Sequence, residues 1–188
     1  MTEKIVWDGR GNNGELVQSA EDYPYELVAY DDLGMSSKVT GVVKVDVLII
    51  RDGDKLKMMI PSIIFRANHA DFGLAKTDAK GNVIEKGITP AQAANNKRIL
   101  KRVSEILNKF ASYKVTVVGH SNYVMANDAE AIPLSRDRAE FVMNEIIKNG
   151  VKAERLSADG KGDTEPVADR KNPDVNWKNR RVEFILQK

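Results

Sequence analysis

The sequence predicts an α/β sandwich in which two helices pack on one face of a mixed β-sheet. Two segments, residues 90–110 and 135–149, carry apolar side chains at helical spacing, and short apolar runs with the length of strands lie between and around them. The order strand, strand, helix, strand, helix, strand, strand is typical of helices that cover one face of a sheet. Residues 1–43, which precede these elements, carry a different pattern without helical spacing.

Residues 1–43 alternate short apolar runs with turn residues, which predicts short strands joined by tight turns. The motifs Trp7-Asp8-Gly9, Tyr23-x-Tyr25-x-Leu27 and Asp32-Leu33-Gly34 make this segment similar to the last strands of immunoglobulin-like domains found with flagellar hook-cap proteins. A complete sandwich of that type needs about 100 residues. We therefore predict a partial β segment whose edges are covered by the main domain or by a second chain.

The main domain is expected to span residues 44–188 and to begin with a β-hairpin. Residues 42–50 and 55–65 are apolar and flank Asp52-Gly53, a strong hairpin signal. Residues 73–88 contain several glycines and little periodicity, which indicates a loop with a small hairpin around Lys80-Gly81-Asn82.

Helix-start signals fix the expected positions of the two helices. Thr89 and Pro90 supply an N-cap and a proline at the first position of the first helix. Ser135 is the expected N-cap of the second helix, and Gly150 ends it. Further strands are expected up to Gly119, at residues 155–158 and at residues 181–186, with an irregular loop over residues 160–176.

Arg138 has an unusual charge for its expected place. Counted from a cap at Ser135, it falls near the third helical position, where a capping box would have Glu and where the helix dipole is already positive. An arginine is favourable there if a carboxylate, from a ligand or from the protein, lies at the helix N-terminus. The alternative is an ordinary surface ion pair with Asp128, Asp137 or Glu140.

Composition excludes several classes of function. The 29 basic and 27 acidic residues are mixed along the chain, so neither a nucleic-acid nor a membrane partner is implied. Cysteine is absent, and His69 and His120 lack any metal-ligand spacing, so no metal or other cofactor is expected. Gly160-Lys161-Gly162 lacks the spacing of a phosphate-binding loop. No set of residues predicts catalysis, and an enzyme that acts on the cell wall would require a carboxylate pair or metal ligands.

A set of motifs carries a more specific signal. These motifs are Gly119-His120, Leu134-Ser135-x-x-Arg138-Ala139, Gly150, Gly160-x-Gly162, Pro166 and Asn179-Arg180-Arg181-Val182. In order and spacing they resemble the C-terminal domain of outer membrane protein A (OmpA), a family shared with the flagellar stator protein MotB and the peptidoglycan-associated lipoprotein. The pattern is most similar to spirochaetal members. The resemblance covers roughly residues 44–188.

The resemblance implies a periplasmic, outer-membrane-associated module that tethers its parent protein to peptidoglycan. The N-terminus has no apolar signal region, so we expect a piece of a longer secreted protein. Such domains hold a diamino acid of the stem peptide, and envelope proteins are further expected partners. Arg138 matches the family arginine that takes the carboxylate.

Other positions of the implied binding site depart from the family or stay ambiguous. The family aspartate that takes the ammonium is Asn122 here, and a family asparagine is Ala131. Loss of the charged contact would weaken binding by about tenfold or more without abolishing it. Asn68 fits a family asparagine or caps a turn, and one of Arg180 and Arg181 is expected to face the ligand. The rival hypothesis is a domain that has lost peptidoglycan binding and serves as a structural or protein–protein interaction module.

Overall fold

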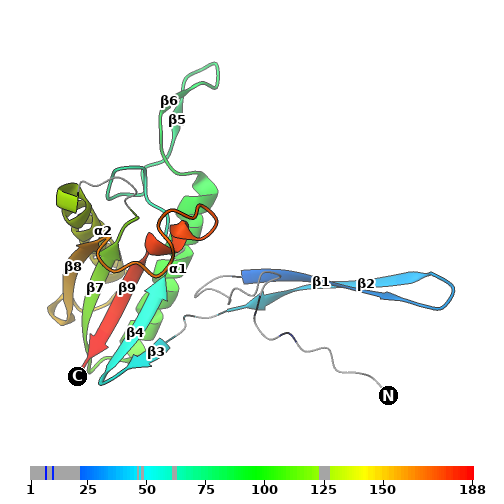
Figure 1. Ribbon diagram of the computed structural model, residues 1–188, viewed down its shortest axis with the longest axis horizontal. Coiled ribbons are helices and arrows are strands. Elements are labelled where there is room, and N and C mark those ends of the chain that lie inside the picture. The colour runs from blue at the N-terminus through cyan, green and yellow to red at the C-terminus, as the bar shows by residue number, and fades with distance from the viewer. Residues whose placement is uncertain are drawn as a thin grey trace.

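The computed structural model describes residues 7, 10, 22–45, 47, 49–60, 63–122 and 128–188. Two long helices pack on a five-stranded mixed sheet, as the sequence predicts (Figure 1). The helices are α1 (Pro90–Lys109) and α2 (Asp128–Lys148). In spatial order the strands are β3 (Ile49–Asp52), β4 (Lys55–Ile60), β9 (Val182–Gln187), β7 (Lys114–His120) and β8 (Leu156–Gly162).

The last strand of the chain lies in the middle of the sheet. β9 runs antiparallel to both of its neighbours, β4 and β7. β7 and β8 are parallel because α2 returns the chain to the starting edge of the sheet between them. Buried residues of β4, β7 and β9 meet both helices in one hydrophobic core, and Met58, Ile60 and Phe184 are fully buried there.

Helix α1 begins where the sequence predicts. Thr89 and Gln92 form a capping box: the Thr89 hydroxyl accepts from the Gln92 amide at 3.2 Å, and the Gln92 side chain accepts from the Thr89 amide at 2.8 Å. At the other end, Arg155 from the short 3₁₀ helix Ala153–Arg155 donates to three backbone carbonyls at 2.7–3.1 Å, those of Leu107, Phe110 and Tyr113. One buried guanidinium thus satisfies the carbonyls at the end of α1.

Helix α2 does not begin at Ser135, so that prediction is wrong. It begins at Asp128 and contains Pro133 in its interior. The Ser135 hydroxyl donates to the Ile132 carbonyl and accepts from the Gly162 amide, both at 2.8 Å. Ser135 therefore joins α2 to β8 and does not cap the helix. The proline and serine imitate a start signal because both are also favoured in the first turn.

Glycines let the backbone of α2 lie directly on β7 and β8. A Cβ atom on Gly119 would lie 1.9 Å from the Ser135 carbonyl oxygen, and one on Gly160 would lie 2.4 Å from the Arg136 amide nitrogen. No side chain fits at either position. Gly160 and Gly162 belong to β8, which extends past the predicted end at residue 158.

The structure also tests two predictions for the hairpins that precede α1, and one of them is wrong. Residues 42–50 do not form one strand, because β2 (Ser36–Lys44) pairs with β1 (Asp22–Tyr30) and β3 begins at Ile49. The small hairpin predicted around residue 81 is present as β5 (Lys76–Thr77) and β6 (Val83–Glu85), and Gly81 has a φ of +85° in its turn.

One face of the β1–β2 hairpin is apolar, and the other face mixes apolar and polar side chains. Paired residues share a face, and the pairs Tyr23–Val43, Tyr25–Gly41 and Leu27–Val39 make one face apolar. Leu27 is 41% exposed and Val39 is 56% exposed. The hairpin extends away from the main sheet (Figure 1), although Asp22 at its base lies 3.4 Å from Arg98 and Arg102 of α1. Thus the main domain does not cover this face with any described residue, and a boundary near residue 43 stays a prediction.

Candidate functional site

Arg138 lies on α2, half-buried against the turn that follows β4. Its Nε donates to the His69 carbonyl oxygen at 3.1 Å, and its guanidinium carbon lies 5.1 Å from the centre of the Phe65 ring. The turn is itself fixed by Arg66, which forms a bidentate pair with Asp71 at 3.0 and 2.7 Å. Arg138 is therefore held in a defined orientation by a backbone carbonyl and an aromatic face.

Arg138 is a cation without an acidic partner among the described residues. Arg138 contacts the His69 carbonyl and the Phe65 ring, and it forms no ion pair with a described side chain. Arg180 likewise forms no ion pair with a described side chain. Burial lowers the pKa of Arg138, and the nearby positive charge of Arg180 lowers it further. An arginine stays protonated even when burial and a neighbouring positive charge lower its pKa. The surroundings of the Arg138 guanidinium therefore favour an anion.

Asn122 is already engaged within the fold. Its Oδ1 accepts from Asn179 Nδ2 at 2.8 Å, and its own Nδ2 donates to the Arg170 carbonyl oxygen at 3.4 Å. Asn179 is buried and also accepts from the amides of Val167 and Ala168 at 2.8 and 2.9 Å. Asn122 thus ties the end of β7 to the loop before β9, through the residue that precedes Arg180 in sequence.

The structure distinguishes the two arginines that the sequence left open. Arg181 is buried: its Nε donates to Glu183 Oε1 at 2.7 Å and its Nη2 to the Glu165 carbonyl oxygen at 3.1 Å. Arg180 is exposed and acts electrostatically on Arg138. We name Arg138, Arg180, Asn122 and Asn179 the arginine site. Arg181 lies inside the fold instead.

Asn68 and Ala131 have local structural roles. Asn68 has a φ of +58° in a turn closed by the His69 amide and the Arg66 carbonyl at 3.1 Å, a conformation that asparagine tolerates. Its exposed side chain lies one residue from the carbonyl that holds Arg138. Ala131 is fully buried in the first turns of α2, next to Gly162. Their part in ligand binding stays a prediction.

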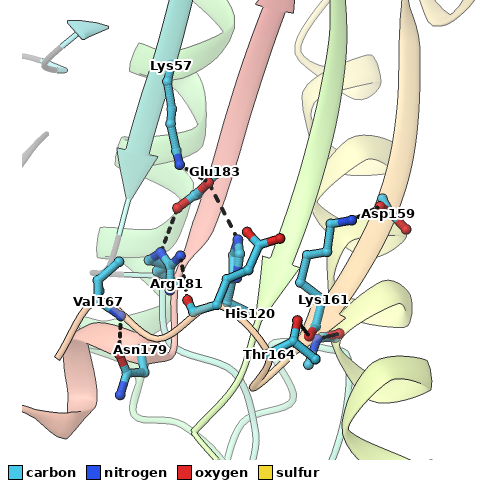
Figure 2. A network of polar contacts seen from close by, with 12 residues as sticks. Lys57, His120, Asp159, Lys161, Thr164, Val167, Asn179, Arg181 and Glu183 are labelled. Carbon is cyan, nitrogen blue, oxygen red and sulfur yellow. Dashed lines mark hydrogen bonds and ion pairs between the residues drawn. The ribbon is translucent and has the colours of Figure 1, made fainter. Parts of the chain in front are cut away.

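Sequence reasoning missed Glu183, which is the centre of a buried charge cluster. Figure 2 shows it between Lys57, Arg181 and His120, with Lys57 Nζ at 2.7 Å and His120 Nε2 at 3.5 Å. Burial opposes the ionisation of Glu183, but His120, Lys57 and Arg181 together lower its pKa to about 2. A signal existed in the sequence, since a carboxylate between the apolar residues Val182 and Phe184 of a central strand needs a basic partner.

The predicted anion position at a helix N-terminus is wrong. Because α2 begins at Asp128, Arg138 lies ten residues into the helix, about 15 Å from its first amides. The amides at the start of α2 therefore cannot share a ligand atom with Arg138. The case for an anion rests on the two guanidiniums alone.

Other kinds of site are not indicated in the described part of the chain. Within it, no group of three or more His, Asp or Glu side chains is placed to hold a metal ion. No helix over the same residues has the length and hydropathy needed to cross a membrane.

Comparisons with known proteins find a family domain within the chain. Residues 88–180 match the model of the OmpA family. ArfA of Mycobacterium tuberculosis, named a peptidoglycan-binding protein, is 32% identical over 88 residues, which are 47% of this chain and 27% of ArfA. The chain spans 11% to 39% of the length of the curated relatives that it matches.

Solved structures share the fold. The periplasmic domain of MotB from Helicobacter pylori has a TM-score of 0.56 at 19% identity, over 76% of this chain and 79% of that one. The cell wall anchor of the T6SS from Pseudomonas aeruginosa has a TM-score of 0.50 at 26% identity, over 75% of this chain and 87% of that one. These likenesses confirm the predicted fold class, whereas the similarity to spirochaetal members stays a prediction.

Proposed function

Since residues 88–180 form an OmpA family domain, we propose that this protein is a non-catalytic module of the bacterial cell envelope that binds peptidoglycan through the stem peptide. The names of ArfA and of the Pseudomonas cell wall anchor support this class of ligand. A periplasmic location, with association to the outer membrane, follows from the same proposal. The parent protein would be tethered to the cell wall by this domain.

One observation carries the proposal: Arg138 is oriented by the protein but left without a described acidic partner. A carboxylate of the stem peptide would supply that partner, and the nearby Arg180 would add a second positive charge. Charge-assisted hydrogen bonds of this kind contribute about 1.5–3 kcal/mol each. Asn68, close to the same turn, would bind the peptide backbone.

Co-sedimentation with purified sacculi tests the proposal. Arg138→Ala is expected to weaken binding at least about tenfold, and Arg180→Ala to weaken it less because Arg180 is exposed. Arg136→Ala is the matched control, since Arg136 lies on the same helix but pairs with Asp159 at 3.2 Å. If Arg138→Ala and Arg136→Ala sediment with sacculi as the unaltered protein does, the proposed site is wrong.

A second candidate function rests on the β1–β2 hairpin. Its apolar face is uncovered by described residues, and exposed apolar surfaces of this kind mark interaction sites. On this alternative the domain no longer binds peptidoglycan and serves as a structural or protein–protein interaction module. Failure of the unaltered protein to sediment with sacculi would favour it.

A further inference from the structure

The buried side chain of Asn179 uses its full hydrogen-bonding capacity within the fold. Its Oδ1 accepts from the amides of Val167 and Ala168 at 2.8 and 2.9 Å. Its Nδ2 donates to the Ala168 carbonyl oxygen at 3.0 Å and to Asn122 Oδ1 at 2.8 Å. A side-chain amide has two donor hydrogens and two acceptor lone pairs, so all four are engaged. Asn179, drawn in Figure 2 with its bond to Val167, therefore joins the loop after β8 to the end of β7.

These bonds hold the backbone on one side of Arg180. Asn179 is the last residue of the 3₁₀ helix Asn176–Asn179 and directly precedes Arg180. On the other side of Arg180, the buried Arg181 is bound to Glu183 at 2.7 Å. Arg180 itself is exposed. Its side chain thus extends into solvent from a backbone that is anchored at both neighbouring residues.

An anchored backbone matters for an exposed arginine because a ligand must immobilise its long side chain. That immobilisation costs conformational entropy, and the cost falls when the backbone is already fixed. The anchoring also keeps the Arg180 guanidinium where its charge acts on Arg138. Building on the proposed function, we propose that Asn179 is a positioning residue of the arginine site and contributes to ligand binding by holding Arg180 in place.

A double-mutant cycle in co-sedimentation with purified sacculi tests this role. Arg180→Ala is expected to weaken binding about threefold, the scale of one exposed charge contact. Asn179→Ala should weaken binding by about the same factor. Two residues that act through one contact have non-additive effects, so the double variant should also bind about threefold more weakly than the unaltered protein. Independent effects would multiply to about ninefold.

Asn176→Ala is the matched control. Asn176 lies in the same 3₁₀ helix, and its side chain donates to the Arg170 carbonyl oxygen at 3.4 Å. This variant is expected to sediment as the unaltered protein does. Urea unfolding shows whether each variant is folded under the conditions of the assay. If Asn179→Ala does not fold, Asn179→Ser, which keeps a polar group, takes its place in the cycle.

The outcomes separate this inference from the proposed function. Losses that multiply in the double variant would show that Asn179 acts independently of Arg180, and unchanged binding of Asn179→Ala would show that it does not act on the ligand. Unchanged binding of Arg180→Ala would leave no contact for Asn179 to act through. Each of these results overturns the positioning role while peptidoglycan binding stands. If sacculi do not sediment the unaltered protein, the proposed function fails and the positioning role fails with it.

Discussion

Replacing Glu183 by glutamine should destabilise the fold strongly at neutral pH. Glu183 is buried to 1% exposure and contacts Lys57 and Arg181 at 2.7 Å each. Glutamine keeps the volume but removes the negative charge, which leaves a buried guanidinium and a half-buried ammonium without their counter-charge. The effect should therefore be electrostatic and should depend on pH.

The size of the effect follows from the pKa of Glu183. In the folded protein that pKa is about 2, against an ordinary value of 4.5. At about 1.4 kcal/mol for each pH unit, the difference corresponds to about 3 kcal/mol of folding free energy. Because the folded pKa is depressed, this stability is fully present above pH 4.5 and is lost as the pH falls toward 2.

Urea unfolding of the two proteins between pH 2 and pH 7 measures this. The variant is expected to be about 3 kcal/mol less stable at pH 7, and the gap should shrink to less than half of that at pH 3. Glu140→Gln, an exposed glutamate on α2, is the control and should change stability by less than about 0.5 kcal/mol. A gap below 1 kcal/mol at pH 7, or one that does not change with pH, would refute the role assigned to the cluster.

Three further predictions concern packing. Gly119→Ala should cost about 3 kcal/mol in urea unfolding, because its Cβ would lie 1.9 Å from the Ser135 carbonyl oxygen; an unchanged midpoint would mean that α2 can move away from β7. Arg155→Lys should cost about 2 kcal/mol, since an ammonium cannot reach all three carbonyls at the end of α1, and a thermal melt that matches the unaltered protein would contradict this. Leu27→Ser on the hairpin should change the unfolding free energy by less than about 0.5 kcal/mol, whereas a loss above 1.5 kcal/mol would show that its apolar face is covered in solution.

The sequence by itself determined the elements whose signals are local. The capping box at Thr89 and Gln92 places the start of α1, the Asp52-Gly53 turn joins β3 to β4, and Gly81 marks the turn of the small hairpin. Each signal acts over a few residues, so it is visible without knowledge of the rest of the fold. The motifs around Arg138 and Arg180 likewise indicated the family.

The tertiary structure alone decided what each polar residue does. Ser135 has the local pattern of a helix cap, yet it bonds to Gly162 from another strand, so the true start of α2 at Asp128 could not be found from neighbours in sequence. Arg180 and Arg181 are adjacent and chemically identical, but both precede β9, and the chain there buries Arg181 beside Glu183 and leaves Arg180 exposed, where its charge acts on Arg138. Partners of this kind are distant along the chain, and only folding brings them within hydrogen-bond range.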